Sequence, residues 1–251
     1  MAGSALTAAS IAAALRRIPA DQPLAWRLRV LPVCASTELE LERWLAAGVQ
    51  PPLALLAQQQ RHGHGQQGRV WQSPPGGVWL SAALPWPAQP AEAASLALAA
   101  AVGIALQLES LGLKPQIKWP NDLLIDGRKL AGILPRLRWR GGRVRYAQLG
   151  VGLNGLNRVP AGAINLAEAL GQRQHPQAQP ACLAARLLRG LEWAAAAADQ
   201  PELVRRQVEQ RLWQPDGIEH NGELWSVAGL AADGGLRLCR NNTEVVLIRQ
   251  F

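Results

Sequence analysis

The chain has 251 residues, which suits one large domain with a small one or two modest domains, and 49% of the residues are apolar, so a sizeable core can form. A charged fraction of only 18% excludes a disordered chain, while the net charge of +8 raises nucleic-acid binding as a hypothesis. Three cysteines without close pairs argue against a disulfide framework or a structural zinc site, and without a secretory signal or a membrane-spanning stretch we expect a cytoplasmic protein.

The first 213 residues mix helices with hairpins. Apolar periodicity and end signals predict helices at residues 10–17, from 37 onward with a Thr37–Glu40 capping box, 92–111, 181–198 and 201–213. Strands are expected at residues 26–33, 53–58, 78–84, 116–119, 123–125, 129–139 and 143–153. Turn signals stand at Asp126-Gly127 and Gly141-Gly142, and the polar, glycine-rich residues 59–75 predict a loop. This mixture is typical of an α+β fold with a mixed, mostly antiparallel sheet.

A different pattern begins after Pro215-Asp216-Gly217. Short alternating runs follow, separated by turn signals at Asn221-Gly222, Gly234-Gly235 and Asn241-Asn242. They predict a small all-β unit. We therefore divide the chain into an N-terminal extension of residues 1–24, a main domain of residues 25–213 and a C-terminal domain of residues 214–251.

The most informative stretch is residues 118–134, which begins Lys-Trp-Pro-Asn-Asp and contains a second lysine, Lys129. The chain has 26 basic residues, and only three of them are lysines: Lys114, Lys118 and Lys129. Lysine presents a compact ammonium charge, whereas arginine presents a planar fork. Two lysines around one motif indicate that a point charge matters there, and chance clustering is the alternative.

The loop between Arg61 and Trp71 has the spacing G-x-G-x-x-G. No strand-to-helix junction surrounds it, so we reject a dinucleotide fold. Glycines still let backbone N–H groups approach an anion, and Arg69 suits a phosphate; a mobile surface loop is the alternative. His62 and His64 lack a nearby Cys or acidic third ligand, so no metal site is predicted.

The second predicted hairpin is rich in arginine, with Arg136, Arg138 and Arg140 on one strand and Arg143 and Arg145 on the other. Strand alternation places the first three on one face. A solvated sheet face is the simpler interpretation. A docking surface for an acidic partner or nucleic acid is the alternative.

Four segments in this order resemble the biotin protein ligases, which activate biotin with ATP and attach it to a lysine of a carrier protein. The segments are Ser36-Thr37, residues 60–74, residues 118–134 and residues 150–154. The resemblance implies a catalytic domain of the class II aminoacyl-tRNA synthetase type over residues 25–213 and a C-terminal domain like an SH3 barrel. Because only 35 residues precede Ser36, it also implies the monofunctional class, without a DNA-binding module.

The resemblance further implies a site. Lys129 would touch both the biotin carboxylate and the α-phosphate of ATP, Arg69 would bind phosphates, and Asp122 would orient the carrier amine and accept its proton; a turn-capping role is the alternative for Asp122. Residues expected to contact biotin are Ser36, Thr37, Gln60, Gly63, His64, Lys129, Gly132, Gly150 and Gly152. Residues expected to contact the nucleotide are Gly65, Gln66, Gly68, Arg69, Trp71, Lys118, Asn121 and Asn154. Mg²⁺ is expected to share the phosphate charge, with no metal ligand assigned.

The resemblance implies biotin carboxyl carrier protein, the acetyl-CoA carboxylase subunit, as the partner. It implies no DNA or membrane partner, and it is compatible with a homodimer. Three residues depart from the family pattern. The glycine loop is usually of the form G-R-G-R-x-G, but His64 and Gln66 stand at its arginines, and Glu38 replaces the usual Asn after Ser-Thr. These changes predict looser retention of the biotinyl-5′-AMP intermediate.

Two alternatives remain open. A lipoate protein ligase has the same fold and chemistry, although its usual loop, R-R-x-S-G-G-G, is absent. A basic nucleic-acid-binding module, with the glycine loop and the arginine hairpin as its surface, is the alternative outside the enzymes.

Overall fold

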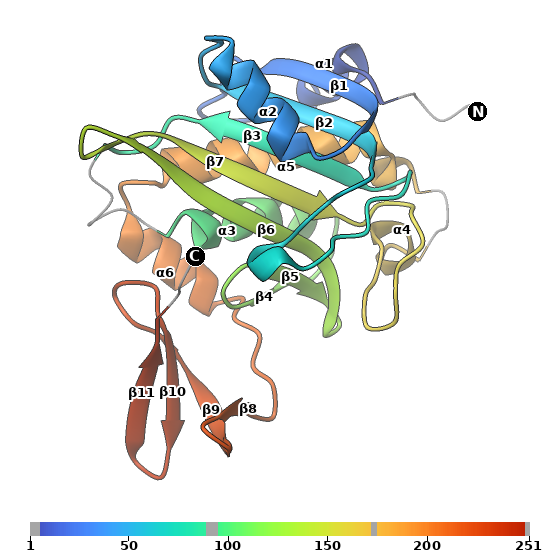
Figure 1. The fold of residues 1–251 in the computed structure, drawn as a ribbon. Coiled ribbons are helices and arrows are strands. Elements are labelled where there is room, and N and C mark those ends of the chain that lie inside the picture. Colours follow the sequence, from blue (N-terminus) through green and yellow to red (C-terminus); the bar gives the residue numbers. More distant parts are fainter. Residues whose placement is uncertain (1–5, 89–94, 172–174, 249–251) are drawn as a thin grey trace.

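A computed structural model of the chain describes residues 6–88, 95–171 and 175–248. Its centre is a seven-stranded sheet in the order β1-β2-β3-β7-β6-β5-β4 (Figure 1). The strands are β1 (Arg27–Cys34), β2 (Leu53–Gln60), β3 (Val78–Leu84), β4 (Gln116–Lys118), β5 (Asp122–Ile125), β6 (Arg128–Arg140) and β7 (Arg143–Leu153). Strands β1 and β2 are parallel and the other paired strands of this sheet are antiparallel, which confirms the predicted α+β class.

Helices lie on both faces of this sheet. They are α1 (Ala8–Leu15), α2 (Thr37–Ala46), α3 (Leu96–Glu109), α4 (Leu166–Ala169), α5 (Pro180–Ala196) and α6 (Pro201–Glu209), with short 3₁₀ turns at Gln66–Gly68 and Pro176–Ala178. Helix α2 lies on one face, and α3 and α5 pack against the other (Figure 1). The strands and helices predicted in this part of the chain are present with shifts of a few residues, and the predicted start of α3 at Glu92 lies outside the described residues.

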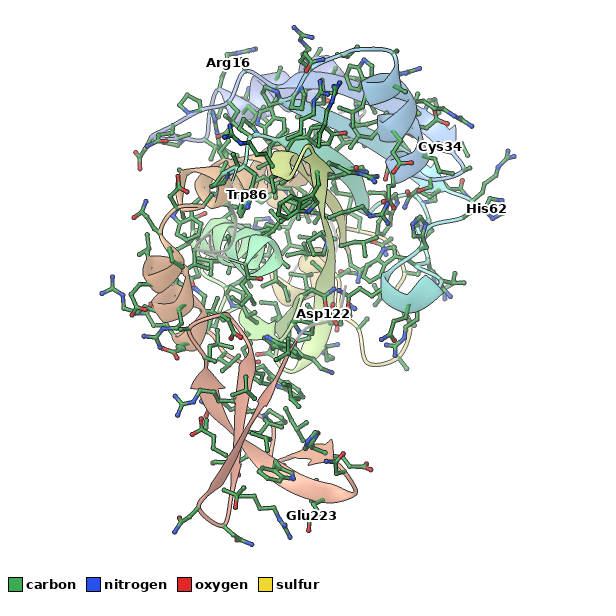
Figure 2. All side chains as sticks on the ribbon, turned by 60° about the vertical axis from the view of Figure 1, so that its left-hand side comes forward. Arg16, Cys34, His62, Trp86, Asp122 and Glu223 are labelled. Atoms are coloured by element: carbon green, nitrogen blue, oxygen red, sulfur yellow. The ribbon has the colours of Figure 1, made fainter. Side chains whose placement is uncertain are left out.

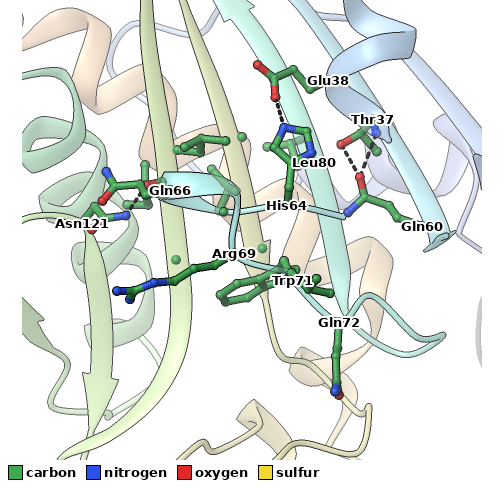
Figure 3. A pocket seen from close by; sticks show the side chains of 18 of the residues that line it. Thr37, Glu38, Gln60, His64, Gln66, Arg69, Trp71, Gln72, Leu80 and Asn121 are labelled. Carbon is green, nitrogen blue, oxygen red and sulfur yellow. Dashed lines mark hydrogen bonds and ion pairs between the residues drawn. The ribbon is translucent and has the colours of Figure 1, made fainter. Parts of the chain in front are cut away.

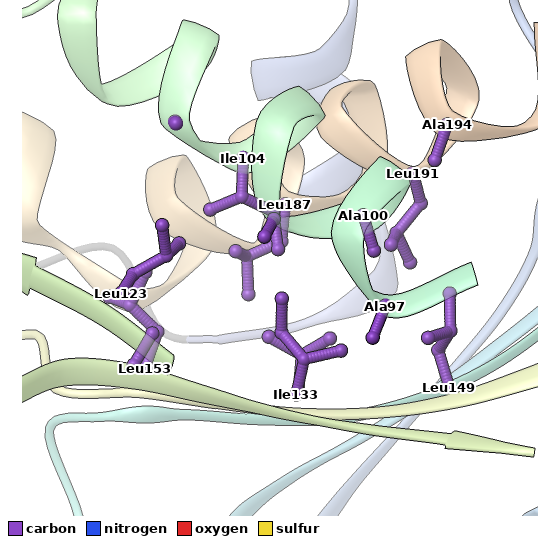
Figure 4. Packing of buried hydrophobic residues seen from close by; sticks show 14 of the residues in the cluster. Ala97, Ala100, Ile104, Leu123, Ile133, Leu149, Leu153, Leu187, Leu191 and Ala194 are labelled. Atoms are coloured by element: carbon purple, nitrogen blue, oxygen red, sulfur yellow. The ribbon is translucent and has the colours of Figure 1, made fainter. Parts of the chain in front are cut away.

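The main core lies between the sheet and helices α3 and α5. Apolar residues of alternate strand positions, such as Ile133 and Leu149, face Ile104 of α3 and Leu187 of α5 (Figure 4). Helix α3 is buried almost all round, as its apolar sequence predicts. The burial of these side chains supplies most of the driving force for folding.

One predicted cap and one predicted helix end are wrong, although α2 does begin at Thr37 as expected. The N-cap of α2 is Ser36, whose side chain accepts the Glu38 N–H, and not Thr37, whose side chain binds Gln60 instead. Helix α6 ends at Glu209, four residues early. Residues 211–213 instead pair with Ile117 of edge strand β4, which receives one backbone hydrogen bond and donates another.

The C-terminal strands form a separate four-stranded antiparallel sheet in the order β11-β10-β9-β8. These strands are β8 (Ile218–His220), β9 (Glu223–Leu230), β10 (Leu236–Arg240) and β11 (Thr243–Leu247). The expected turns hold residues of positive φ, including Asn221 at 53° and Asn241 at 48°. In Figure 2, Glu223 marks the far end of this sheet, opposite the end of the molecule that carries Cys34 and His62. The predicted small β unit is confirmed.

The arginines of the β6–β7 hairpin do not form the single solvated face that alternation predicts. A β-bulge between Arg138 and Trp139 breaks the alternation. Arg136 and Arg138 form ion pairs with Glu38 and Glu42 of helix α2. The Arg136 and Arg138 side chains remain 47% and 32% exposed, so this face is solvated in part and also carries ion pairs to α2.

None of the helices within the described residues has the length and apolar character that crossing a membrane requires.

Candidate active site

The site is a cavity of about 380 Å³ on the α2 side of the sheet, within the usual size range of small-molecule pockets. Strand register builds its floor. Asp122 of β5 pairs with Gly132 of β6, which pairs with Gly152 of β7. Gly150 of β7 pairs with Ser81 of β3, so small residues lie beside polar ones on a single face. The first turn of α2 and the glycine loop close the sides.

Lys129 is the lysine that points into this cavity. Its Nζ lies 2.7 Å from Asp122 Oδ2 and 5.0 Å from the centre of the Trp71 ring. Its backbone is held by the segment beyond β7, because its N–H donates to Gly162 and its carbonyl accepts from Ile164. An ammonium held by one carboxylate and one aromatic face is well placed and can exchange the carboxylate for an anionic ligand.

One end of the pocket is a chain of uncharged hydrogen-bonding groups. Thr37 donates from its N–H and its hydroxyl to Gln60 Oε1 at 2.8 and 2.9 Å, and its hydroxyl lies 2.8 Å from Ser81 Oγ. Gln60 Nε2 donates to Ser73 Oγ at 2.8 Å. Figure 3 shows Thr37 and Gln60 joined across the pocket wall. Such groups suit a neutral polar ligand, because they offer both donors and acceptors without charge.

The glycine loop folds over the pocket as a small turn. A bridge between His64 and Val70 closes it, and the Gly65 N–H donates to the Arg69 carbonyl at 2.8 Å. Two buried side-chain donors, Gln66 Nε2 and Trp71 Nε1, have no hydrogen-bond partner among the described residues. Buried donors left unpaired are unfavourable unless a ligand or water receives them, so both indicate where polar atoms of a ligand are to be sought.

Two of the glycines on the floor of the pocket, Gly132 and Gly152, lie against the side chain of Trp71 and not against open space. A Cβ on Gly152 would lie 2.4 Å from Trp71 Nε1, and a Cβ on Gly132 would lie 3.0 Å from the Trp71 ring. A Cβ on Gly150 would meet only Leu134, at 3.4 Å. We expected all three glycines to admit a ligand; in this structure two of them admit the indole of Trp71.

Most of the predicted residues meet in this pocket, and three do not line it. The predicted residues that line it are Ser36, Thr37, Gln60, His64, Gly65, Gln66, Arg69, Trp71, Asn121, Asp122, Lys129, Gly132, Gly150, Gly152 and Asn154. Gly63 is buried beneath the loop, where a Cβ would lie 2.5 Å from the Trp71 carbonyl oxygen, and Gly68 lies outside the lining. Lys118 is exposed, with its Nζ 4.9 Å from the centre of the Trp213 ring.

Two asparagines of the site have partners of their own. Asn121 Nδ2 donates to the Ile133 carbonyl at 2.6 Å, and the Ile133 N–H donates back to the Asn121 carbonyl. Asn154 Oδ1 accepts from Asn157 Nδ2 at 3.0 Å. Both side chains therefore hold loops in place, and the Asn121 Oδ1 atom remains available to the pocket.

Sequence reasoning did not select three polar residues of the lining as ligand contacts: Glu38, Gln72 and Ser81. Ser81 is 1% exposed and was read as part of an apolar strand, although a lone serine in such a strand is itself a signal. Glu38 was noted only as a departure, because an acid in the first turn of a helix has an ordinary explanation in the helix dipole.

Cys34 lies beside the pocket without serving it as a nucleophile. Burial, together with the nearby Glu40 carboxylate, raises the pKa of the Cys34 thiol to about 11. At neutral pH the thiol is therefore protonated, and the thiolate that a covalent mechanism needs is scarce.

The fold matches solved structures of one class of enzyme. The biotin protein ligase from Aquifex aeolicus in complex with biotin and ATP has a TM-score of 0.66 and 22% identity, covering 91% of this chain and 96% of that one. The chain therefore has the biotin protein ligase fold, which confirms the predicted class II synthetase-like catalytic fold with a small C-terminal β domain.

Sequence comparison identifies the family. The profile of the biotin/lipoate A/B protein ligase family matches residues 30–154, and these residues therefore form a domain of that family. The bifunctional ligase/repressor BirA of Bacillus subtilis is 39% identical over 108 residues, 42% of this chain and 33% of that protein. The biotin--[acetyl-CoA-carboxylase] ligase of Paracoccus denitrificans is 34% identical over 126 residues, 48% of this chain and 51% of that protein. The chain thus spans about a third to a half of the length of these relatives.

Proposed function

We propose that this protein is an ATP-dependent ligase that activates biotin as biotinyl-5′-AMP and transfers it to a lysine of a carrier protein. The observation that carries the proposal is the position of Lys129. It lines one cavity together with an uncharged polar group, formed by Thr37, Gln60 and Ser81, and with a glycine loop that bears Arg69. The family domain and the Paracoccus relative's name support the same chemistry.

In the first step a biotin carboxylate oxygen attacks the α-phosphorus of ATP, an O–P bond forms, and pyrophosphate leaves. Two anions must approach each other, so positive charge at their meeting point lowers the barrier most. Lys129 supplies that charge when its ammonium moves from Asp122 to the carboxylate and the α-phosphate. Arg69 binds phosphate oxygens, and the uncharged polar end receives the ureido ring of biotin.

In the second step the carrier lysine's amine attacks the biotinyl carbonyl carbon, a C–N bond forms, and AMP leaves with the anhydride oxygen. The amine must be neutral to attack, although a free lysine has a pKa near 10.4. Asp122, released by Lys129 in the first step, can accept the amine's proton and pass it to water. One carboxylate thus holds the ammonium before activation and serves as the base after it.

Mg²⁺ belongs with the nucleotide in this proposal. Within the described residues, no three His, Cys, Asp or Glu side chains gather as a metal cage would require. The two carboxylates that line the pocket, Glu38 and Asp122, already have cationic partners. Mg²⁺ often enters such sites on phosphate oxygens, so we assign it to the phosphates of ATP and not to protein side chains.

The proposed function also assigns domains to the chain and a carrier protein as its partner. We propose residues 25–213 as the catalytic domain and residues 214–251 as the C-terminal domain, preceded by an extension of residues 1–24. Arg189 of α5 donates to the carbonyls of Leu15 and Ile18, so this extension packs on the catalytic domain. The carrier is biotin carboxyl carrier protein of acetyl-CoA carboxylase, and three free cysteines suit the cytoplasm.

The deciding experiment is exchange of radiolabelled pyrophosphate into ATP, measured with biotin and with lipoate. We expect exchange that depends on biotin, followed by biotin transfer to a purified carrier domain. Exchange with lipoate alone would make the protein a lipoate ligase. Absence of exchange with either acid would reject the ligase function and favour the nucleic-acid-binding alternative.

A further inference from the structure

A charge network at the mouth of the pocket joins three separate segments of the chain. Glu38, in the first turn of α2, accepts from His64 Nε2 of the glycine loop at 2.8 Å and from Arg136 of β6 at 2.8 Å. The two bonds use different carboxylate oxygens, and the Glu38 side chain is 13% exposed. Figure 3 shows the imidazole of His64 turned toward Glu38. The carboxylate is therefore fully engaged by protein groups.

Two backbone hydrogen bonds hold the start of the glycine loop, because the Arg61 and His62 N–H groups donate to the carbonyls of Cys34 and Ala35. Besides these bonds and the packing of Trp71 on the strand glycines, three side-chain attachments hold the loop. Its start is fixed by Gln60, which accepts from Thr37, and its end by Ser73, which accepts from Gln60. These two attachments are uncharged and lie at the base of the loop. The third is the bond from His64 to Glu38, which holds the beginning of the turn that carries Gln66 and Arg69.

The position of His64 decides the position of this turn. His64 and Val70 form the bridge that closes it, so the five residues between them move with His64. Gln66 and Arg69, which line the pocket, lie within that interval. Breaking the contact between His64 and Glu38 would leave the attachments at the two ends of the loop intact and would remove the ion pair that holds the turn itself.

Arg136 makes Glu38 suitable for this task. It holds the second carboxylate oxygen and lies 3.6 Å from Glu42, one helical turn farther along α2, which also pairs with Arg138. The alternative, that Glu38 contacts the substrates directly, is unfavourable because both substrates are anionic at the point where they react.

We propose that Glu38 is a positioning residue that holds the glycine loop closed over the pocket through His64, with Arg136 orienting its carboxylate. If the protein is the proposed ligase, retention of the activated acyl-adenylate depends on this contact between the loop and helix α2; this consequence rests on the proposed function. Gln66 and His64 do not place a positive charge on the bound intermediate. The contact between His64 and Glu38 compensates in part, because it keeps the loop closed over the pocket.

The first test uses the ligand-free protein and measures hydrogen exchange of backbone amides in residues 61–72. Glu38→Ala and His64→Ala should each raise exchange in the loop about three- to fivefold, the size expected for a partly exposed ion pair. Glu42→Ala is the matched control, because it removes a carboxylate bonded to the same arginine without touching the loop. The double variant Glu38→Ala/His64→Ala should exchange no faster than either single variant.

The second test measures release of preformed biotinyl-AMP in a chase, and pyrophosphate exchange over a range of substrate concentrations. Release should rise about three- to fivefold in Glu38→Ala and His64→Ala, and the KM for the substrates should rise by a larger factor than kcat falls. Unchanged loop exchange in both single variants would overturn the proposal, as would an equal effect of Glu42→Ala. His64→Ala keeps the test valid if Glu38→Ala folds poorly. Failure of the wild-type protein to exchange pyrophosphate would overturn the ligase function and leave the loop result standing.

Discussion

The two faces of the seven-stranded sheet use the same strands for opposite purposes. The face toward α3 and α5 presents alanine, leucine, isoleucine and valine, and its side chains are almost entirely buried (Figure 4). The face toward α2 presents glycine, serine and acidic residues over its pocket, with two buried donors left unpaired. The apolar side chains of the first face are stabilised by packing against the helices, whereas the unpaired donors of the second face need a bound ligand or water as a partner.

Close contacts require glycine on both sides of the sheet, for different reasons. A Cβ on Gly103 of α3 would lie 2.0 Å from the Gly190 carbonyl oxygen of α5, so two backbones touch where the helices cross. On the other face, Gly152 makes room for the side chain of Trp71. Backbone cannot move aside as easily as a side chain. The same substitution should therefore affect stability on one face and activity on the other.

The largest effect is expected at the pocket. Lys129→Arg should fold normally and lose biotin-dependent pyrophosphate exchange by about 10²–10³-fold, because a guanidinium cannot occupy the same point between two anions. Lys114→Arg, the same change at an exposed lysine outside the pocket, serves as the control. Near wild-type exchange by Lys129→Arg would remove Lys129 from the mechanism.

A substitution at the crossing of α3 and α5 should change stability and not activity. Gly103→Ala should lower the free energy of unfolding by about 3 kcal/mol, because the helices must separate to admit the methyl group. Urea denaturation measures this, with activity of the folded fraction expected to be unchanged. A variant as stable as wild type would mean that the helix crossing adjusts freely.

Gly152→Ala should reverse that pattern. Its Cβ displaces the Trp71 ring, which we expect to raise the KM for ATP about tenfold with little change in the urea midpoint. Gly150→Ala is the matched control on the same strand, since its Cβ meets only Leu134 at 3.4 Å. Equal KM values for the two variants would contradict a role for Trp71 in nucleotide binding.

An effect of similar size concerns retention of the intermediate. Gln66 Nε2 is buried without a partner, whereas the neighbouring Gln67 is exposed and outside the pocket. Gln66→Arg should slow release of preformed biotinyl-AMP about tenfold, because it adds a charge-assisted hydrogen bond. Gln67→Arg should not change the rate. Equal release from Gln66→Arg and wild type would place retention on other residues.

The sequence was sufficient for local features whose signals lie within a few residues. Strand β3 has the predicted bounds, Val78–Leu84, and the turns at Asp126-Gly127 and Gly141-Gly142 have positive φ as their residues require. The order of elements and the α+β class follow from the same periodicities. The motif around Lys129 indicated where the chemistry of the chain is concentrated.

Contacts between distant segments could not be read in the same way. The pairing of Arg136 and Arg138 with glutamates of α2 has no local signal, and neither has the contact of Lys118 with Trp213, ninety-five positions along the chain. Which partner a charged side chain meets depends on how the layers pack, and no local pattern encodes that.

By itself, then, the sequence determined the helices, the strands, the turns and the group of residues from which a site could be made. Their periodicity, propensity and spacing act over a few residues. Only the tertiary structure decided that Asp122 holds Lys129, that Trp71 fills the space above Gly152, and that Glu38 joins the glycine loop to α2. Those contacts exist because packing of the core brings separate segments onto one face of the sheet, where distance and burial select the partners.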